Sequence, residues 1–307
     1  MKGIDPTIVM SQHLIAILQA LFVVFLWATS WVLVKIGLQD IPPVTFAGLR
    51  YFLAFICLLA FAALKGSGKD IRQLTISIWL RLIVLGALFY AVTQGAIFVA
   101  LAYLPAVTVN LLWSFSSVIV AVMGAIWLAE RPSGIQWFGM SLAVLGAVLY
   151  FYPVEIPHSQ TIGVVVALIG ILANSFSSIL GRDVNRSGRI HPLVVTVISM
   201  GAGSVMLLAA GIATEDLPTI DLQGWGIILW LALVNTAFAF TLWNHTLRTL
   251  SAVESSIING TMMIWIPVLA ILFLGETVTP KEVLGLVVTG LGTLIVQLRK
   301  RPANKGR

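Results

Sequence analysis

The stretch AVTVNLLWSFSSVIVAVMGAIWLAE, residues 106–130, determines how the rest of the chain is interpreted. Its apolar part is long enough to cross a bilayer as one helix, since a membrane core takes about 20 mostly apolar residues. A second stretch, AVESSIINGTMMIWIPVLAILFLGE, residues 252–276, has the same length, begins with the same dipeptide and ends on the same acid. The two copies lie 146 residues apart, which indicates an internal repeat.

The same offset continues downstream and pairs Gly139 with Gly285 and Gly146 with Gly292. Identical apolar residues at the two positions are weak evidence for a repeat, because most of this chain is apolar. Identical glycines and glutamates are stronger evidence, because these residue types are tolerated at few positions in a membrane helix. Small residues recur every four positions around these glycines, a spacing that lets helices approach closely. We therefore expect packing seams in the helices near 135–152 and 282–298, with a homodimer contact as the alternative.

Composition places the whole chain in a membrane. Hydrophobic residues make up 59% of the 307 and charged residues 10%, with a mean hydropathy of +1.02, whereas soluble domains carry about 25% charged residues. The predicted fold is an all-α integral membrane protein of ten transmembrane helices in two inverted five-helix repeats, residues 1–153 and 154–307. The predicted spans are 14–36, 44–64, 79–102, 106–129, 135–152, 162–181, 192–213, 225–247, 252–274 and 282–298.

The distribution of positive charge predicts the orientation. With ten spans, only Lys35, Arg50 and Lys281 of the 18 Lys and Arg residues fall on the side opposite the termini. Positively charged loops stay in the cytoplasm, so we expect both termini inside and a location in the cell's inner (plasma) membrane. The basic tail 299–307 is interpreted as a cytoplasmic anchor beside anionic lipid rather than a nucleic-acid binder.

An odd number of helices per repeat inverts the second copy relative to the first. Inverted repeats are a known construction of secondary transporters, whose substrate site lies at the repeat interface near the bilayer midplane. The sequence therefore favours a transporter of a small metabolite. Two alternatives remain: an intramembrane enzyme acting on a lipid-linked substrate, and a non-transporting receptor or assembly subunit.

Several segments in order resemble one known family. They are LWATS (26–30), VKIGL (34–38), PPVTFAGLR (42–50), AYLPA (102–106), LAER (128–131), QWFG (136–139) and LGE (274–276). Together they resemble both repeats of the EamA family of the drug/metabolite transporter superfamily. The resemblance implies ten helices around a central cavity, alternating access, and export of amino acids or other metabolites. The family's mid-span proline is missing near Ser117 in the fourth helix and appears late, as Pro267, in the ninth.

Polar side chains within the spans are the candidates for substrate contact, because burial of polar groups in a bilayer is costly. They fall on predicted helices one, three, four, six, eight and nine, as a shared cavity would require. The substrate-binding candidates are Trp27, Thr29, Ser30, Tyr90, Gln94, Trp113, Asn174, Asn235, Trp243, Asn244 and Asn259. The structural alternative is hydrogen bonding between helices for the polar side chains, and core filling or interfacial anchoring for the tryptophans.

Four ionisable residues are candidates for gating or proton transfer. Lys35 and Arg50 lie near helix ends, where they either attract an anionic group or extend to the lipid headgroups. His245 and Glu254 are candidates for a protonation site, and the other interpretation is a salt bridge from Glu254 to Arg248.

The sequence contains no signature of a cofactor, metal or enzyme site. GSGKD, residues 66–70, lacks the upstream glycine and following Ser/Thr of a nucleotide-binding loop. The single cysteine, Cys57, excludes an intrachain disulfide. We expect no cofactor, metal or catalytic residue. The expected partners are a small-molecule substrate and membrane lipids, with no nucleic acid and with a homodimer left open.

Overall fold

The computed structural model describes residues 6–66, 71, 73–127, 133–153, 157–186 and 190–297. Every regular element in these ranges is helical. Nine stretches of them are long and apolar enough to cross a membrane. They agree with nine of the ten predicted spans to within a few residues, apart from shorter ends at Met123 and Ile257. The chain is therefore an integral membrane protein. The element α15 (Pro280–Gln297), at the position of the tenth prediction, is helical but is not among the nine.

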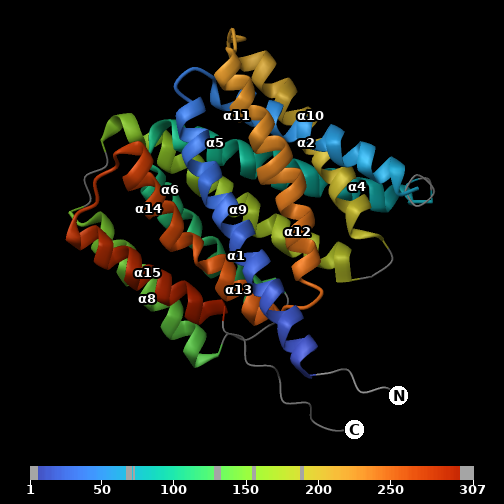
Figure 1. Ribbon diagram of the computed structural model, residues 1–307. Coiled ribbons are helices and arrows are strands. Elements are labelled where there is room, and N and C mark those ends of the chain that lie inside the picture. Colours follow the sequence, from blue (N-terminus) through green and yellow to red (C-terminus); the bar gives the residue numbers. More distant parts are fainter. Residues whose placement is uncertain are drawn as a thin grey trace.

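The remaining helices follow in chain order (Figure 1). The first repeat contains α1 (Pro6–Gly37), α2 (Pro43–Leu64), α4 (Ile76–Gly86), η1 (Ala87–Gln94), α5 (Gly95–Tyr103), α6 (Ala106–Ser114), α7 (Ser116–Trp127) and α8 (Gly134–Phe151). The second contains α9 (His158–Arg186), α10 (Pro192–Thr214), α11 (Leu222–Ala232), η2 (Leu233–Phe238), α12 (Ala239–Thr246), α13 (Ala252–Gly260) and α14 (Met262–Leu274), followed by α15.

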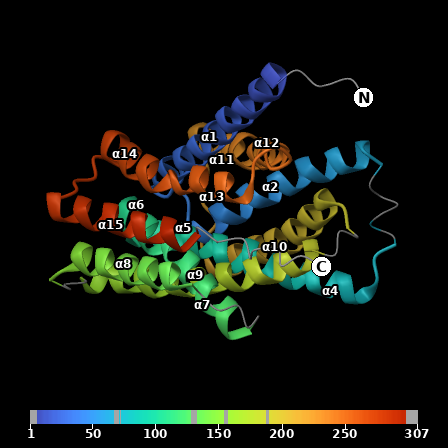
Figure 2. The same ribbon diagram turned by 90° about the horizontal axis from the view of Figure 1, so that it is seen from below.

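Two helix pairs, each with one member from either repeat, pack backbone against backbone. The first is α8 along α15, and the second is α2 along α10 (Figures 1 and 2). A Cβ on Gly146 would lie 2.4 Å from the Thr289 backbone nitrogen, and one on Gly48 would lie 2.6 Å from the Leu208 Cα. The predicted seam between the fifth and tenth helices is thus confirmed as a contact within one chain.

The repeat is visible in two local irregularities of the helices. The π-helical segments η1 and η2 begin at Ala87 and Leu233, positions 146 residues apart. The helices α6–α7 and α13–α14 are interrupted at Phe115 and Thr261, also 146 residues apart. Matching irregularities at one offset show that the sequence repeat is also a structural repeat.

Neither interruption has a proline at the position where the helix breaks. At Phe115 and Thr261 the backbone N–H donates to the carbonyl three residues earlier, at 3.1 Å and 3.0 Å, a local 3₁₀ step. Ser114 and Thr261 also donate their hydroxyls to carbonyls three residues earlier. Such side-chain bonds compete with the helical ladder and bend it, so serine and threonine accompany the bend here.

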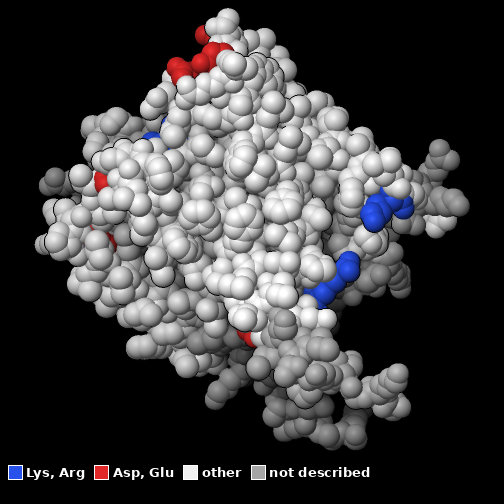
Figure 3. Space-filling model, in the orientation of Figure 1, with Lys and Arg blue, Asp and Glu red and all other residues white. Residues whose placement is uncertain are grey.

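The visible face in Figure 3 is largely uncharged, with acidic and basic groups at its margins. Exposed large apolar side chains such as Leu14, Leu172 and Leu272 cover the helices, as expected for a surface in contact with lipid. The basic tail, together with Glu130 and Arg131 of the family-like motif, lies outside the described residues.

Candidate functional site

A central cavity of about 270 Å³ lies between the two repeats. Helices α1, α2, η1, α5 and α6 line it from the first repeat, and α9, α12 and α14 from the second. The lining residues are Trp27, Ser30, Trp31, Val34, Arg50, Tyr51, Phe89, Thr93, Gln94, Ile97, Phe98, Leu101, Trp113, Asn174, Phe240 and Met262. The six helices predicted to surround a cavity all contribute, and α2 joins them.

The side chain of Arg50 places a positive charge in the wall of the central cavity. Its side chain is only 5% exposed, and its Nε donates a hydrogen bond to Thr236 Oγ1 at 3.2 Å. Its guanidinium carbon lies 5.1 Å from the centre of the Tyr51 ring and 5.9 Å from that of Phe98. Among the described residues it has no ion pair with a carboxylate. Arg50 therefore lies inside the protein, and the interpretation that it extends to the lipid headgroups is wrong.

Gln94 is held in place by a tyrosine of the neighbouring helix. The Tyr51 hydroxyl donates to Gln94 Oε1 at 2.7 Å, and the Tyr51 ring lies edge-on to Tyr90 at 5.7 Å between centroids. Because the Gln94 carbonyl accepts this bond, its amide NH₂ is the group left for a ligand.

Trp27 belongs to an aromatic cluster in the cavity wall. Its ring lies 5.2 Å from those of both Phe240 and Trp243. Its indole nitrogen is buried and has no hydrogen-bond partner among the described residues. A buried donor without a partner is costly.

The structure separates the predicted site residues into two groups. Trp27, Ser30, Gln94, Trp113, Asn174 and Arg50 line the central cavity. Thr29, Tyr90, Asn235, Trp243, Asn244, Asn259, Lys35, His245 and Glu254 lie outside its lining. Asn235 is fully buried and donates its amide to the Leu26 carbonyl and to Thr29 Oγ1, which matches the expected interhelical alternative. Asn244, His245 and Asn259 are exposed.

Several aromatic lining residues were not predicted, among them Tyr51, Phe98 and Phe240. For Phe98 and Leu101 a signal was available, because they follow Gln94 at the four- and seven-residue spacing of one helical face. Nothing in the sequence distinguishes Phe240 from the neighbouring Phe238, which is 49% exposed.

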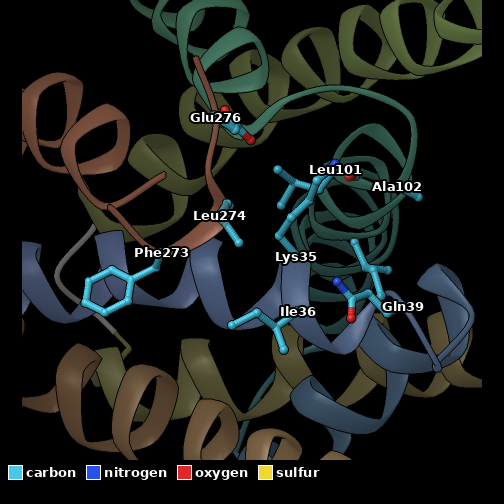
Figure 4. Close-up of a pocket in the computed structure, with 9 residues that line it drawn as sticks. Lys35, Ile36, Gln39, Leu101, Ala102, Phe273, Leu274 and Glu276 are labelled. Atoms are coloured by element: carbon cyan, nitrogen blue, oxygen red, sulfur yellow. Dashed lines mark hydrogen bonds between the residues drawn. The ribbon is translucent and has the colours of Figure 1, made fainter. Parts of the chain in front are cut away.

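A second pocket of about 340 Å³ lies at the end of the bundle where α1 terminates, and is called here the Lys35 pocket (Figure 4). Lys35 Nζ donates to the carbonyls of Leu101 and Leu104, at 2.5 Å and 2.8 Å, at the C-terminus of α5. Glu276, which follows α14, accepts from the backbone N–H groups of Ala106 and Val107 at 2.6 Å and 3.1 Å, at the start of α6. A cation at a helix C-terminus and an anion at an N-terminus both match the helix dipoles. The turn between α5 and α6 is thus held from both sides.

Glu215 makes the corresponding contact with α2. Its carboxylate, just after α10, accepts from the N–H groups of Val44 and Thr45 at 3.0 Å and 2.7 Å. Carboxylates of the second repeat therefore cap two helices of the first at the same end of the molecule.

At the other end of α1, Glu254 pairs with His13, with 2.9 Å between Oε1 and Nε2. Glu254 also completes a capping box with Ser251 at the start of α13. Neither the predicted pairing with His245 nor the alternative salt bridge with Arg248 is among the ion pairs of the described residues. Nor do three metal-ligating side chains gather anywhere in those ranges.

The hydrogen bonds from Ser251, aided by His13, lower the pKa of Glu254 below its ordinary value of 4.5. A carboxyl with a lowered pKa stabilises the folded state above its unfolded pKa, and this contribution is lost as the pH falls through the folded value. We expect the difference in Tm between the wild type and Glu254→Gln not to decrease from neutral pH down to about 4.5 and to shrink below it. Thermal unfolding in detergent at a series of pH values measures this, and a difference that already shrinks between pH 7 and 6 would contradict it.

Comparisons with known proteins agree with this architecture. The model of the EamA-like transporter family matches residues 14–152 and again residues 161–298. The uncharacterized inner membrane transporter YedA of Escherichia coli (strain K12) is 26% identical over 94% of this chain and 93% of its own length. A protein of the same strain named "Probable amino-acid metabolite efflux pump" is 27% identical over 93% and 96%. A solved crystal structure shares the fold, with a TM-score of 0.64 at 16% identity over 92% of this chain and 96% of that one.

Proposed function

This chain belongs to the EamA-like transporter family, and we propose that it is a secondary transporter that exports amino acids or related metabolites by alternating access. That it is a membrane transporter follows from the family and from its relatives. The finer proposal is supported by one observation above the others, the central cavity lined by both repeats with the buried Arg50 in its wall. A relative named as an amino-acid metabolite efflux pump supports the substrate class and the direction.

The contacts between repeats support alternating access. The carboxylates of Glu215 and Glu276 connect the second repeat to the starts of α2 and α6 in the first, at the end where α1 terminates. Leu101 lines both the Lys35 pocket and the central cavity and is fully buried. A transporter must break such contacts to open this end, and charge-assisted hydrogen bonds to helix termini can break and re-form without unfolding the helices. This end is proposed to face away from the cytoplasm, because only three of the 18 Lys and Arg residues fall on its side.

No observation favours a different class of partner. The glycine seams of α8 and α15 are occupied within the chain, so they offer no argument for a homodimer. The proposed partners are a small-molecule substrate and the lipids of the inner membrane, without nucleic acid and without a cofactor.

Transport by the purified protein tests the proposal. Liposomes containing the protein are loaded with a labelled panel of amino acids, N-acylated amino acids and deaminated analogues, and efflux is followed with and without a pH gradient. We expect saturable, protein-dependent efflux of at least one class. A response to the gradient would indicate proton coupling, and its absence would indicate facilitated diffusion or exchange. Efflux no faster than from protein-free liposomes, with correctly folded protein and the whole panel, would contradict the proposal.

A further inference from the structure

The charge of the central cavity restricts what it can bind. Of the sixteen lining residues, Arg50 is the only one that carries a charge at neutral pH, and none is Asp, Glu or His. The site therefore offers a positive charge and lacks an acidic group that could pair with a cation.

The Arg50 guanidinium has hydrogen-bonding capacity to spare. It has five N–H donors in a planar fork, and its hydrogen bond within the described residues is the single bond from Nε to Thr236. Burial of a charge without an opposite charge is strongly unfavourable, and the Tyr51 and Phe98 rings compensate only in part. The fork matches the two oxygens of a carboxylate.

The other polar groups in the wall are neutral. The Gln94 carbonyl already accepts from Tyr51, which leaves its NH₂ as a second donor near Arg50 in the same wall. The Ser30 hydroxyl donates to the Trp27 carbonyl, so its oxygen is left as a neutral acceptor. Arg50 and Gln94 therefore both favour a ligand that brings acceptor oxygens.

The rest of the wall is apolar and largely aromatic. Trp31, Phe89, Trp113, Phe240 and Met262 surround the polar groups within about 270 Å³. This volume suits a small molecule with a compact apolar or aromatic body, since ligand sites bury most of the ligand surface.

We propose that the substrate is a small carboxylate with a net negative charge and an apolar or aromatic body, bound through Arg50, such as an N-acylated or deaminated amino acid. The α-ammonium group of a free amino acid would find no carboxylate in the wall. This inference rests on the proposed transport function and narrows its substrate class.

Binding to the purified protein tests the substrate class separately from transport, because Trp27, Trp31 and Trp113 line the cavity and their fluorescence reports occupancy. Four matched probes differ mainly in charge: N-acetylphenylalanine and 3-phenylpropionate as anions, phenylalanine as a zwitterion, and phenylalanine amide as a cation. We expect both anions to bind at least about tenfold more tightly than phenylalanine, and the cation to bind most weakly. Equal or tighter binding of phenylalanine or its amide would overturn the proposal.

Variants assign the carboxylate to Arg50. Arg50→Gln is expected to weaken binding of N-acetylphenylalanine about 10- to 100-fold, while phenylalanine amide binds no more weakly than before. Arg81→Gln is the matched control, because Arg81 is exposed at the surface beside Asp183. Arg50→Lys, which keeps the charge and loses the planar fork, is expected to weaken the anion several-fold, and it serves as the test if Arg50→Gln does not fold. Unchanged anion affinity in a folded Arg50→Gln variant, or in Arg50→Lys if that variant alone folds, would overturn the assignment.

The two proposals fail in distinguishable ways. Tight anion binding without efflux would contradict the transport proposal and leave the ligand class standing. Efflux of phenylalanine that persists in Arg50→Gln would support transport and overturn the ligand class.

Discussion

Gly292→Ala is expected to lower the Tm of the protein by roughly 5 °C or more. A Cβ at this position would lie 2.4 Å from the Ala143 backbone nitrogen and 2.7 Å from the Gly139 carbonyl oxygen. These are backbone atoms of a packed helix, so α8 and α15 must separate to admit one methyl group. Overpacking of this kind costs about 1–3 kcal/mol, and each kcal/mol corresponds to a few degrees of Tm in a chain of this size. Thermal unfolding of purified protein in detergent measures the change.

Gly290→Ala is the matched control on the same helix. A Cβ there meets only the end of the Met263 side chain, at 3.9 Å. Because alanine is a better helix former than glycine by about 1 kcal/mol, the Tm of this variant should be unchanged or higher. Equal losses of Tm in both variants would show that the close contact between α8 and α15 does not determine stability.

Glu276→Gln is expected to open the end of the bundle at which α1 terminates. The change removes the charge that accepts from Ala106 and Val107 and leaves one neutral acceptor oxygen. A hydrogen bond to a charged group contributes about 1.5–3 kcal/mol, more than a neutral one. We therefore expect the open state to gain about tenfold in population. A cysteine at Ser30, which is 6% exposed in the cavity wall, should then react about tenfold faster with an impermeant thiol reagent added from this side. Cys57→Ala removes the single native thiol.

Glu282→Gln provides the comparison for this prediction. Glu282 is also an acidic residue at this end, but among the described residues its carboxylate bonds only to Thr279 within its own segment and does not connect the repeats. Its replacement should leave the labelling of Ser30→Cys unchanged. If Glu276→Gln also left the labelling rate unchanged, its contact with α6 would not hold this end closed.

Two kinds of feature were predictable from the sequence. One depends on the average hydropathy of many residues, and the other occurs where the structure permits only one or two residue types at a position. Membrane spans come from runs of about 20 apolar residues, and nine of them agree with the structure. The seam of α8 and α15 was predictable because only small residues permit such close approach, and Gly139, Gly146, Gly285 and Gly292 recur at one offset. The six polar helices around the cavity followed from the cost of placing polar groups against lipid.

The unpredicted features depend on tertiary contacts. Arg50 is the eighth residue of α2, close enough to the start of the helix that its burial depends on which neighbours cover it. Glu254 lies nine residues after His245 in the sequence, but it pairs with His13, because α1 packs beside α13. The π-helical segments η1 and η2 carry threonines bonded five residues back, Thr93 to Leu88 and Thr236 to Leu231. Threonine occurs in many ordinary α-helices, so these two threonines did not predict the π-helical segments.

Labelling of Ser30→Cys from the two sides of the membrane tests alternating access most directly. In right-side-out and in inverted membrane vesicles, both carrying Cys57→Ala, an impermeant maleimide is added with and without N-acetylphenylalanine. We predict that Ser30→Cys reacts from both sides, that bound ligand slows both reactions, and that Glu276→Gln speeds the reaction from the Lys35 side while slowing the other. Reaction from one side only, under every condition including Glu276→Gln, would contradict the account.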